Sequence, residues 1–393
     1  MRIGIFTDSY HPHVSGVTTS IDMLKEALIK MGHKVFIVAP NLDKFKFYYD
    51  KDNEVIYLPG IKTGIYNTRF AEIYSRKAMK IIKNEWKLDI IHTQSEFGVG
   101  FFSKKVAKKL KLPIVHTYHT LYDDYVYYVT KGHFDKFAKK VVLKLTKYYC
   151  NGADELIVPT KKIKDLFNNK YGIDRDMFVI PTGIDIDRFY PNKSNTKAAK
   201  ELRKKYKLDN TFVIGSVGRI AKEKCLDKIL YNLKDLVKYN SNIRAMFVGD
   251  GPYLKELKKI TKELNLEKYV IFTGLIDYNI LPNYYQVIDA MVNFSNTETQ
   301  GLTVIEGLAS AKVVVCLNDP SFKEMVEHNY NGFLFDNDEE YKEYILNLMN
   351  DKDLYKNMCL NAKNSTYAYS KEVFASNLLK VYNKAIKKKT NSK

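Results

Sequence analysis

The chain has 393 residues, of which 45% are hydrophobic and 27% charged, as in globular proteins long enough for two domains. No apolar run reaches the roughly 18 residues of a membrane-spanning helix, and the N-terminus lacks the apolar stretch of a signal peptide. The net charge of +18 indicates either an anionic partner or a general lysine-rich bias in composition. Four scattered cysteines without a CxxC pair disfavour a disulfide framework or a zinc site and fit a reducing cytoplasm.

The first half of the chain alternates short apolar runs with helical patterns. Residues 2–6 and 32–40 predict strands, and residues 20–31 between them predict a helix, because apolar side chains recur there at helical spacing. Further strand-like runs lie at 55–59, 88–93, 112–118 and 155–160. This rhythm predicts a parallel sheet with helices on both faces.

The same pattern restarts near residue 212. Strand-like runs lie at 212–220, 244–252, 269–276, 289–295 and 312–319, and helical patterns at 226–237 and 370–386. The polar segment 190–210 contains Pro191 and is interpreted as the crossing between domains. We therefore predict an α/β protein of two Rossmann-like domains, residues 1–190 and 191–369, whose ligands bind at the carboxyl ends of the strands.

The loop after the first strand has features of an anion site. Gly16 lies just before a predicted helix, where a glycine lets backbone N–H groups approach an anion and the helix dipole adds attraction. A plain tight turn explains the same residues, because a single glycine is not a GxGxxG motif. The loop VGDGP at 248–252 is interpreted as a shaped turn, with Pro252 opening a helix.

The segment GRIAKEK at 218–224 places two cations after a strand. Arg219 can contact a diphosphate as a fork of donors and Lys224 as a point charge. Together they would stabilise the charge that develops on a departing nucleotide diphosphate. Glu223 lies between them and leaves open the alternative of a solvated basic loop.

The stretch ETQGLTVIEG at 298–307 carries two carboxylates eight residues apart. N–H groups around Gly301 and Leu302 would point at a ligand above the strand ends. Glu306 lies among apolar residues of the following helix and needs partners, for which the vicinal hydroxyls of a ribose are suited. Glu298 in the loop can accept hydrogen bonds from sugar hydroxyls. Two structural glutamates, one at the surface and one bonded to a neighbouring loop, are the alternative.

These signals, in this order, resemble the retaining glycosyltransferases of family four, which have the GT-B fold of two Rossmann-like domains facing a central cleft. The residues that carry the resemblance are the SGV loop at 15–17, HTYHT at 116–120, GRIAKEK at 218–224, VGDGP at 248–252, FTG at 272–274 and ETQGLTVIE at 298–306. The resemblance implies a hexosyltransferase that uses a UDP-sugar. It also implies that the helix at 370–386 packs back on the N-terminal domain.

The resemblance further implies a role for each site residue. The donor site would comprise Gly16 at the β-phosphate, Arg219 and Lys224 at the diphosphate, Gly274 at the uracil, Glu298 with the N–H groups of Gly301 and Leu302 at the sugar and phosphate, and Glu306 at the ribose. His119 would contact the donor sugar at its 6-hydroxyl and joins Glu298, Arg219 and Lys224 as a catalytic residue. Without the family, a lone histidine at a strand end is more often structural.

Retention at the anomeric carbon is implied as well, by front-face attack in which the departing phosphate takes the acceptor proton. No enzymic base and no tightly bound cofactor are then expected. The segment DID at 185–187 looks like the DxD motif that binds metal in other glycosyltransferases. Here it lies in the interdomain segment PTGIDIDRF, so we predict no metal site and no Mg²⁺ requirement at a protein site.

A finer resemblance, to bacterial diacylglycerol glucosyltransferases, suggests a lipid acceptor. The residues behind it are SGVTTSIDMLKEAL, QSEF at 94–97, HTYHTLYDDYVYYV, VPTKKI, RIAKEK and TETQGLT. It implies transfer of glucose from UDP-glucose to the free hydroxyl of 1,2-diacylglycerol, giving alpha-monoglucosyldiacylglycerol.

A basic amphipathic helix is predicted where such an enzyme would contact lipid, because residues 103–147 hold eleven Lys and three Asp. One helical face carries Phe134, Phe137, Ala138, Val141, Val142 and Leu145. The tyrosines at 122, 125, 127 and 128 could line a lipid entry or the bilayer interface, or could equally pack within the domain. We predict a cytoplasmic enzyme bound peripherally to anionic lipids on the inner face of the cell membrane. The alternative is that this face packs on the core and that the lysines are solvated.

Two other functions stay open. A family-four enzyme that uses another nucleotide sugar on a soluble, teichoic acid or polysaccharide acceptor would carry the same donor motifs. A nucleic-acid-binding protein is prompted by charge alone, but the sequence contains no recognised nucleic-acid module, so no nucleic acid partner is predicted.

Overall fold

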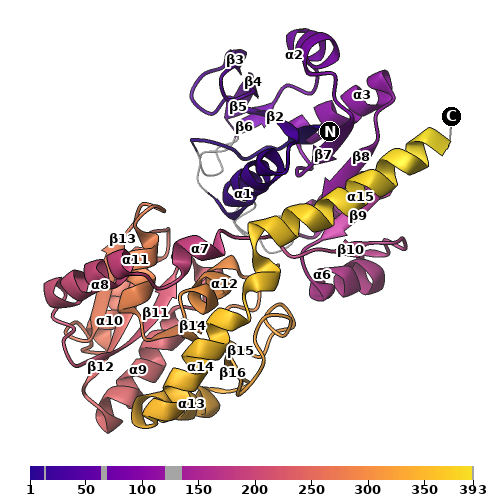
Figure 1. The fold of residues 1–393 in the computed structure, drawn as a ribbon. Helices are drawn as coiled ribbons and strands as arrows, with labels where there is room; N and C mark the ends of the chain where they lie inside the picture. Colours follow the sequence, from indigo (N-terminus) through magenta and orange to yellow (C-terminus); the bar gives the residue numbers. More distant parts are fainter. Residues whose placement is uncertain (13–14, 63–68, 120–134, 392–393) are drawn as a thin grey trace. The chain divides into compact units, whose positions relative to one another are not determined.

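The chain folds into two compact units in a computed structural model (Figure 1). The structure describes residues 1–12, 15–62, 69–119 and 135–391. Unit 1 comprises Met1–Ile184 together with Lys371–Lys393, and unit 2 comprises Asp185–Ser370. Each unit has its own hydrophobic core around a mostly parallel sheet, so the predicted α/β class is confirmed.

Unit 1 is built on an eight-stranded sheet in the order β10-β9-β8-β7-β1-β2-β4-β3. Its strands are β1 (Arg2–Phe6), β2 (Lys34–Pro40), β3 (Tyr48–Asp50), β4 (Val55–Leu58), β7 (Ile90–Thr93), β8 (Ile114–Thr117), β9 (Glu155–Val158) and β10 (Phe178–Val179). Strand β3 pairs antiparallel with β4, and the other pairings are parallel. A separate antiparallel hairpin consists of β5 (Gly60–Lys62) and β6 (Arg69–Ala71). The central strands are buried along their length, as a parallel sheet covered on both faces requires.

The last helix of the chain completes the core of unit 1. The helices of this unit are α1 (Gly16–Lys30), α2 (Arg76–Ile81), α3 (Gly98–Leu110), α5 (Asp135–Asn151), α6 (Lys161–Leu166) and α15 (Lys371–Asn391), with π-helical turns η1 (Ile82–Trp86) and η2 (Phe167–Tyr171). Helix α15 lies against α1 and buries Phe374, Leu378 and Tyr382 in the core that contains β1. The Tyr382 hydroxyl hydrogen-bonds to His92 Nδ1 at 2.6 Å, so α15 is also tied to β7.

Unit 2 has an all-parallel, six-stranded sheet in the order β13-β12-β11-β14-β15-β16. Its strands are β11 (Phe212–Val217), β12 (Ile243–Val248), β13 (Val270–Gly274), β14 (Ala290–Asn293), β15 (Val313–Leu317) and β16 (Gly332–Phe335). Its helices are α7 (Ile186–Phe189), α8 (Lys193–Lys205), η3 (Lys222–Lys224), α9 (Asp227–Tyr239), α10 (Leu254–Glu263), α11 (Leu281–Val287), α12 (Leu302–Ala309), α13 (Asp338–Asn350), α14 (Lys352–Asn364) and η4 (Tyr367–Tyr369). Apolar side chains from both sets, among them Ile214, Leu233, Phe247 and Val315, form one core.

In both units the strand order reverses beside the first strand. Strand β1 lies between β2 and β7, and β11 lies between β12 and β14. The chain builds outward on one side of that strand and then returns to its other side. Loops that leave the carboxyl ends of the two flanking strands diverge there, which is where ligands bind in sheets of this kind.

Several boundaries differ from the prediction. Helix α1 begins at Gly16 rather than at residue 20, because the Ser15 hydroxyl accepts a hydrogen bond from Thr18 N and caps the helix there. Segment 190–210 is not a simple polar crossing, since α8 occupies its centre and is capped by Asn192. Strands β3, β5, β6, β10 and β16 are only two to four residues long, and no sequence pattern predicts them.

Candidate active site

Two loops of unit 2 meet where the order of its strands reverses. The loop that contains Arg219 and Lys224 follows β11, and the loop that contains Glu298 follows β14. Because β11 and β14 are parallel neighbours, both loops leave the sheet at the same edge. Residues that are far apart in the sequence are thereby brought within contact distance.

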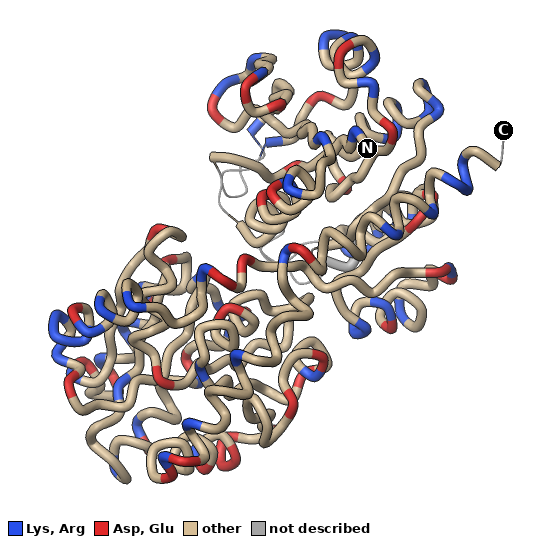
Figure 2. The backbone as a smooth tube through the Cα atoms, in the orientation of Figure 1, with Lys and Arg blue, Asp and Glu red and all other residues tan. Residues whose placement is uncertain are grey.

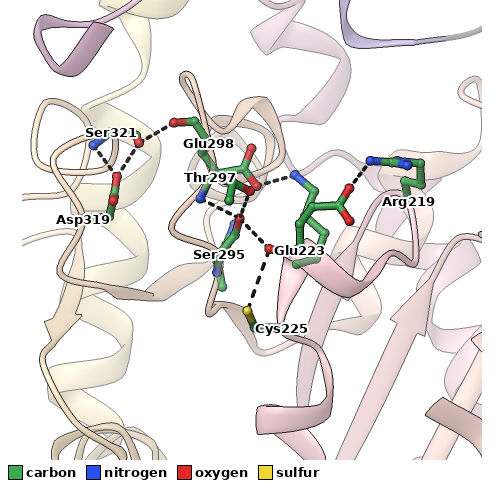
Figure 3. A network of polar contacts seen from close by, with 10 residues as sticks. Arg219, Glu223, Cys225, Ser295, Thr297, Glu298, Asp319 and Ser321 are labelled. Carbon is green, nitrogen blue, oxygen red and sulfur yellow. Dashed lines mark hydrogen bonds and ion pairs between the residues drawn. The ribbon is translucent and has the colours of Figure 1, made fainter. Parts of the chain in front are cut away.

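Each predicted phosphate-binding cation is paired with a carboxylate in these loops (Figure 3). Lys224 Nζ lies 2.5 Å from Glu298 Oε1, and the Arg219 guanidinium forms an ion pair with Glu223. The Arg219 and Lys224 side chains are 30% and 27% exposed, so a ligand can reach them. We call Arg219, Glu223, Lys224 and Glu298 the charged cluster. Glu223 was not predicted to take part in a site, and its position between Arg219 and Lys224 in the sequence was the only signal.

Hydroxyl groups fix the two loops to their surroundings. Ser295 Oγ donates to the carbonyl oxygen of Glu223 at 3.4 Å, which links the loop after β14 to the loop after β11. Ser321 Oγ donates to the carbonyl oxygen of Glu298 at 2.8 Å from the loop after β15 (Figure 3). These bonds to the backbone restrict where the charged side chains can be placed, as a preorganised site requires.

Gly301 shapes the start of helix α12. Its φ of +86° lies in the left-handed region, and a Cβ atom there would approach Phe322 Cε1 to 2.7 Å. The chain turns at this glycine, and α12 begins at Leu302. The first N–H groups of the helix therefore follow directly on the Glu298 loop, an arrangement that favours an anion.

Glu306 is buried within α12 and hydrogen-bonded to a tyrosine. The residue is 5% exposed, and the Tyr285 hydroxyl from α11 donates to its Oε2 at 2.6 Å. Burial raises the pKa of Glu306 to about 7, and the hydrogen bond from Tyr285 opposes this rise. The sequence predicts that this carboxylate needs partners, but it does not identify Tyr285, because α11 and α12 come together only in the tertiary fold.

Gly274 ends strand β13 next to two other glycines at this edge. Gly249 N donates to the carbonyl oxygen of Gly274 at 3.1 Å. A Cβ atom on Gly249 would lie 1.9 Å from the carbonyl oxygen of Gly218, so only glycine fits this approach. The loop VGDGP therefore forms a tight turn, and it places Gly274 at the same edge of the sheet as the charged cluster.

In unit 1, His119 follows β8 and contacts Gln94, which follows β7. His119 Nε2 donates to Gln94 Oε1 at 2.8 Å, which leaves Nδ1 as the acceptor of the neutral ring. Burial lowers the pKa of His119 to about 4, so the ring is uncharged near pH 7. Gln94 was not singled out from the sequence, where the stretch QSEF served only as part of the family resemblance.

The loops after β1 and β7 are joined through Asp8. Its carboxylate accepts hydrogen bonds from Phe97 N at 3.1 Å, from Val99 N at 3.0 Å and from the Ser95 hydroxyl. Burial raises the pKa of Asp8 to about 7. Asp8 was not predicted as a site residue, although a carboxylate just after a buried strand was an available signal. Gly16 opens α1 in this unit, so Gly16 and His119 lie in unit 1 and the other predicted site residues in unit 2.

The described part of the chain contains no group of three or more His, Cys, Asp or Glu side chains placed to hold a metal ion. In the DID segment, Asp185 Oδ2 lies 3.8 Å from Arg188 Nε, and the short helix α7 contains Asp187. Asp185 thus has a local ion-pair partner at the start of unit 2.

Two family models and several curated proteins match the chain. The model described as Glycosyltransferase Family 4 matches residues 14–188, and the model described as Glycosyl transferases group 1 matches residues 198–365. The chain is 35% identical to the alpha-monoglucosyldiacylglycerol synthase of Acholeplasma laidlawii, with 97% of this chain and 96% of the relative covered. It is 37% identical to the protein of the same name from Streptococcus pneumoniae, over 85% of this chain and 75% of the relative.

Solved structures share the fold at lower identity. HepE from Anabaena, in complex with UDP, matches with a TM-score of 0.75 at 18% identity, over 98% of this chain and 100% of that chain. Sucrose-phosphate synthase from Thermosynechococcus elongatus matches with a TM-score of 0.76 at 19% identity, over 97% and 98% of the two chains. These likenesses confirm the predicted GT-B fold. With relatives above 30% identity over most of its length, the chain belongs to the family-four glycosyltransferases of the GT-B fold and is a hexosyltransferase.

Proposed function

We propose that the protein transfers glucose from UDP-glucose to the free hydroxyl of 1,2-diacylglycerol at a membrane surface, with retention, giving alpha-monoglucosyldiacylglycerol. The observation that carries the proposal is the charged cluster at the carboxyl ends of β11 and β14, followed by Glu306 in α12. The names of two curated relatives support the sugar and the acceptor. HepE structures in complex with UDP and with UDP-glucose support the donor.

The diphosphate of the donor would replace the two carboxylates as partner of the cations. Arg219 offers a planar fork of N–H donors and Lys224 three donors, so both can hold phosphate oxygens. When the bond between the sugar C1 and the phosphate oxygen breaks, the electron pair stays on that oxygen, and both cations stabilise it. The N–H groups around Gly301 and Leu302 would add to this stabilisation, and Gly16 would let the backbone approach the β-phosphate.

The nucleoside and the sugar would be held by the remaining predicted residues. Glu306, once ionised, can accept hydrogen bonds from both ribose hydroxyls, and the backbone near Gly274 would contact the uracil. Glu298, released from Lys224 by the diphosphate, would accept hydrogen bonds from sugar hydroxyls. The neutral ring of His119 would accept a hydrogen bond from the 6-hydroxyl through Nδ1.

We attribute retention at the anomeric carbon to front-face substitution. The acceptor oxygen bonds to C1 on the face that UDP leaves, and the acceptor proton moves to the departing phosphate oxygen. His119, with a pKa of about 4, is too weak a base to take that proton, and the departing phosphate oxygen takes it instead. Because Arg219 and Lys224 would neutralise the charge of the leaving UDP, we propose that no protein-bound metal and no Mg²⁺ take part. Turnover that is lost after EDTA treatment would overturn this part of the proposal.

The donor is assigned to unit 2, and the acceptor and the membrane to unit 1. Helix α5 supports this assignment, because apolar and basic side chains lie side by side at its surface. Val141 is 50% exposed, Val142 and Leu145 are half-buried, and Lys140 and Lys144 are exposed. Such a helix can lie in the headgroup region of an anionic bilayer. This would place the enzyme in the cytoplasm, bound peripherally to the inner face of the cell membrane.

Helix α5 also contacts the core. Leu143 packs against a core cluster, and Tyr149 and Cys150 are buried. Tyr149 lies one turn after Leu145 on the predicted face, so one edge of that face packs on the core while Val141 on the same face is exposed. Phe134 and the tyrosines at 122, 125, 127 and 128 lie outside the described residues.

None of the helices in the described ranges has the length and apolarity needed to cross a bilayer.

The proposal is tested by giving the purified protein labelled UDP-glucose, UDP-galactose or UDP-GlcNAc with diacylglycerol in mixed vesicles. We expect an alpha-linked glucosyl lipid from UDP-glucose, identified by mass spectrometry and by the anomeric coupling constant. An Arg219→Ala, Lys224→Ala double variant should lose about 100-fold or more of this activity, because each charged hydrogen bond contributes roughly 1.5–3 kcal/mol.

The matched control removes two exposed lysines elsewhere in unit 2, Lys255→Ala with Lys259→Ala on α10, and should leave transfer unchanged. Transfer to a soluble sugar, a teichoic acid precursor or a polysaccharide, with none to diacylglycerol, would contradict the lipid acceptor. A product from UDP-galactose alone would contradict the glucose donor.

A further inference from the structure

A basic groove of about 920 Å³ lies in unit 1 between helix α15 and the segments that lead into β9 and β10. Its lining residues are Asn151, Ala153, Glu155, Arg175, Asp176, Lys380, Asn383, Lys384, Lys387 and Lys388. The α15 residues recur at helical spacing, so one face of the helix forms one wall of the groove. We call this space the basic groove.

The basic groove lies at the edge of the sheet opposite to the one that carries the candidate active-site residues of unit 1. Glu155 is the first residue of β9, and Arg175 and Asp176 precede β10. His119 and Gln94, in contrast, follow β8 and β7. Because all four strands are parallel, the groove lies at their amino ends and the histidine at their carboxyl ends. The basic groove is therefore a separate site.

The charges of the groove favour an anion. Five of its lining side chains are cationic and two are carboxylates, a net charge of +3. Lysine positions recur along the last turns of α15 (Figure 2). The Arg175 guanidinium is held in place by the carbonyl oxygens of Ala153 at 2.8 Å and Asp154 at 3.1 Å. A concave surface lined by cations of this density attracts phosphate groups.

One buried carboxylate adds a second recognition element. The side chain of Glu155 is 3% exposed, and its oxygens lie 3.5 Å from Lys384 Nζ and 3.8 Å from Lys388 Nζ. In the described part of the chain, no hydrogen-bond donor is placed on Glu155 Oε1. A buried carboxylate oxygen needs a donor, and a ligand hydroxyl can supply one.

We propose that the basic groove binds a phosphate ester that carries a neighbouring hydroxyl group, with the phosphate held by the α15 lysines and the hydroxyl donating to Glu155. Lys384 and Lys388 each have three donors, so they can face both Glu155 and the phosphate. A free sugar phosphate or glycerol phosphate and a phospholipid headgroup share this chemistry. The site is independent of the donor site in unit 2.

The first experiment titrates the full-length protein with glycerol 3-phosphate and with inorganic phosphate in a calorimeter. We expect glycerol 3-phosphate to bind more tightly. The Lys384→Ala, Lys388→Ala double variant should weaken its binding at least tenfold, and Glu155→Gln should remove its advantage over inorganic phosphate. Because the first variant leaves Glu155 without cations, Lys380→Ala with Lys387→Ala provides a second test that does not touch the Glu155 ion pairs.

The second experiment distinguishes the source of the phosphate by flotation with vesicles of phosphatidylglycerol or of phosphatidylcholine. Loss of binding to phosphatidylglycerol in the groove variants assigns the site to a lipid headgroup, and unchanged flotation together with weaker glycerol 3-phosphate binding assigns it to a free ester. Arg219→Ala in unit 2 and the Lys255→Ala, Lys259→Ala pair are controls that should retain both interactions. If the groove variants bind both probes as the controls do, the proposal is wrong.

Discussion

At the scale of single residues, the state of Glu306 is set by burial and by one hydrogen bond. Burial raises its pKa to about 7, whereas the Tyr285 hydroxyl stabilises the carboxylate and opposes the rise. Protonated and ionised forms therefore coexist near neutral pH in the ligand-free protein. Only the ionised form can accept from both ribose hydroxyls, so the affinity for UDP should rise with pH through this range. The free energy of unfolding should fall as the pH rises from about 4.5 to 7, because in this range the folded state holds a proton on Glu306 that the unfolded state has released.

Replacing Tyr285 by phenylalanine removes the hydrogen bond that favours the carboxylate, so the pKa of Glu306 should rise further. A hydrogen bond to a charged group contributes roughly 1.5 kcal/mol, which corresponds to about one pH unit. We expect the pH of half-maximal UDP affinity to move up by about one unit in Tyr285→Phe, with little change at high pH. Calorimetric titration from pH 5.5 to 9 measures this shift. Tyr231→Phe, an exposed tyrosine on α9, is the control, and an unchanged midpoint in Tyr285→Phe would contradict the role of the pair.

Glu223 is expected to oppose the binding of a diphosphate. Its side chain is 11% exposed and neutralises Arg219 in the ligand-free protein, so its charge stays close to where the diphosphate would lie. Glu223→Gln keeps the size of the side chain and the backbone carbonyl that accepts from Ser295, but it removes this charge. UDP should then bind about three- to tenfold more tightly, as expected for loss of a partly exposed charge repulsion. Equilibrium binding of UDP measures the effect, with Glu256→Gln on α10 as the control; weaker binding in Glu223→Gln would show that Glu223 positions Arg219 instead.

The sequence predicts residues of the site best where they follow an apolar strand. Arg219 and Glu298 come after runs that are recognisable as buried strands, and parallel strands bring their carboxyl ends to one edge. Tyr285 and Gln94 could not be predicted in this way, because each acts through a neighbour from another element. Glu306 was predicted as a buried carboxylate that needs partners and His119 through the family resemblance, but the packing that joins each of them to its partner was not predicted.

At the scale of elements, the predictions depend on how strongly each segment shows a local pattern. Strand β11 is a continuous apolar run and was predicted at nearly its observed place. Helix α8 was missed because it is mostly polar and is stabilised by its contact with α11, which no local pattern shows. Helix α5 was predicted from its amphipathic pattern, but the pattern alone could not decide between packing and membrane contact. Exposure of Val141 supports the proposed surface role, which the vesicle experiment below tests.

Reversing two lysine charges on α5, in Lys140→Glu with Lys144→Glu, should weaken binding to anionic vesicles. Each lysine near an anionic surface contributes roughly 1 kcal/mol, so loss of both should weaken binding about 30-fold. The two introduced carboxylates are repelled by the surface, so the decrease should be at least this large. The thermal midpoint should change little, because both side chains are exposed. Flotation with vesicles of increasing anionic lipid content measures the effect.

The control for the α5 variant is Lys255→Glu with Lys259→Glu in unit 2, which removes the same charge from a helix with no assigned membrane role. Raising the salt concentration should weaken binding of the wild-type protein and of this control alike, because salt screens the attraction. Equal binding of the wild-type protein to neutral and to anionic vesicles would contradict the membrane role of α5.

At the scale of the whole molecule, the chain leaves unit 1 after Ile184 and returns to it at Lys371. Unit 2 is therefore one continuous segment, whereas unit 1 needs residues from both ends of the chain. The helical period at 370–386 predicts the last helix, but an amphipathic pattern fits any apolar surface. Its attachment to the first domain came from the family resemblance, and the buried Phe374 and Tyr382 show its physical basis.

This arrangement predicts that residues 185–370 fold and bind UDP without the rest of the chain. The segment contains Arg219, Lys224, Glu298 and Glu306, and its six strands form one sheet. Among the described residues, no helix from outside the segment contributes to its core. We expect a cooperative thermal transition. The UDP dissociation constant should lie within about tenfold of that of the full-length protein, which allows a loss of about 1.4 kcal/mol of binding free energy from the missing Gly16 of unit 1. Glucosyl transfer should be absent, because unit 1, to which the acceptor is assigned, is missing together with His119.

The reciprocal fragment, residues 1–184, lacks α15 and should not fold cooperatively, because the apolar surface of β1 and α1 that α15 covers becomes exposed. Adding a peptide of residues 371–391 should restore its thermal transition, and the same peptide with Leu378→Asp and Tyr382→Asp should not. If the 185–370 segment folds but does not bind UDP while the full-length protein does, unit 1 supplies an essential part of the donor site. The assignment of the donor to unit 2 alone would then be wrong, and the charged cluster would be only one half of the site.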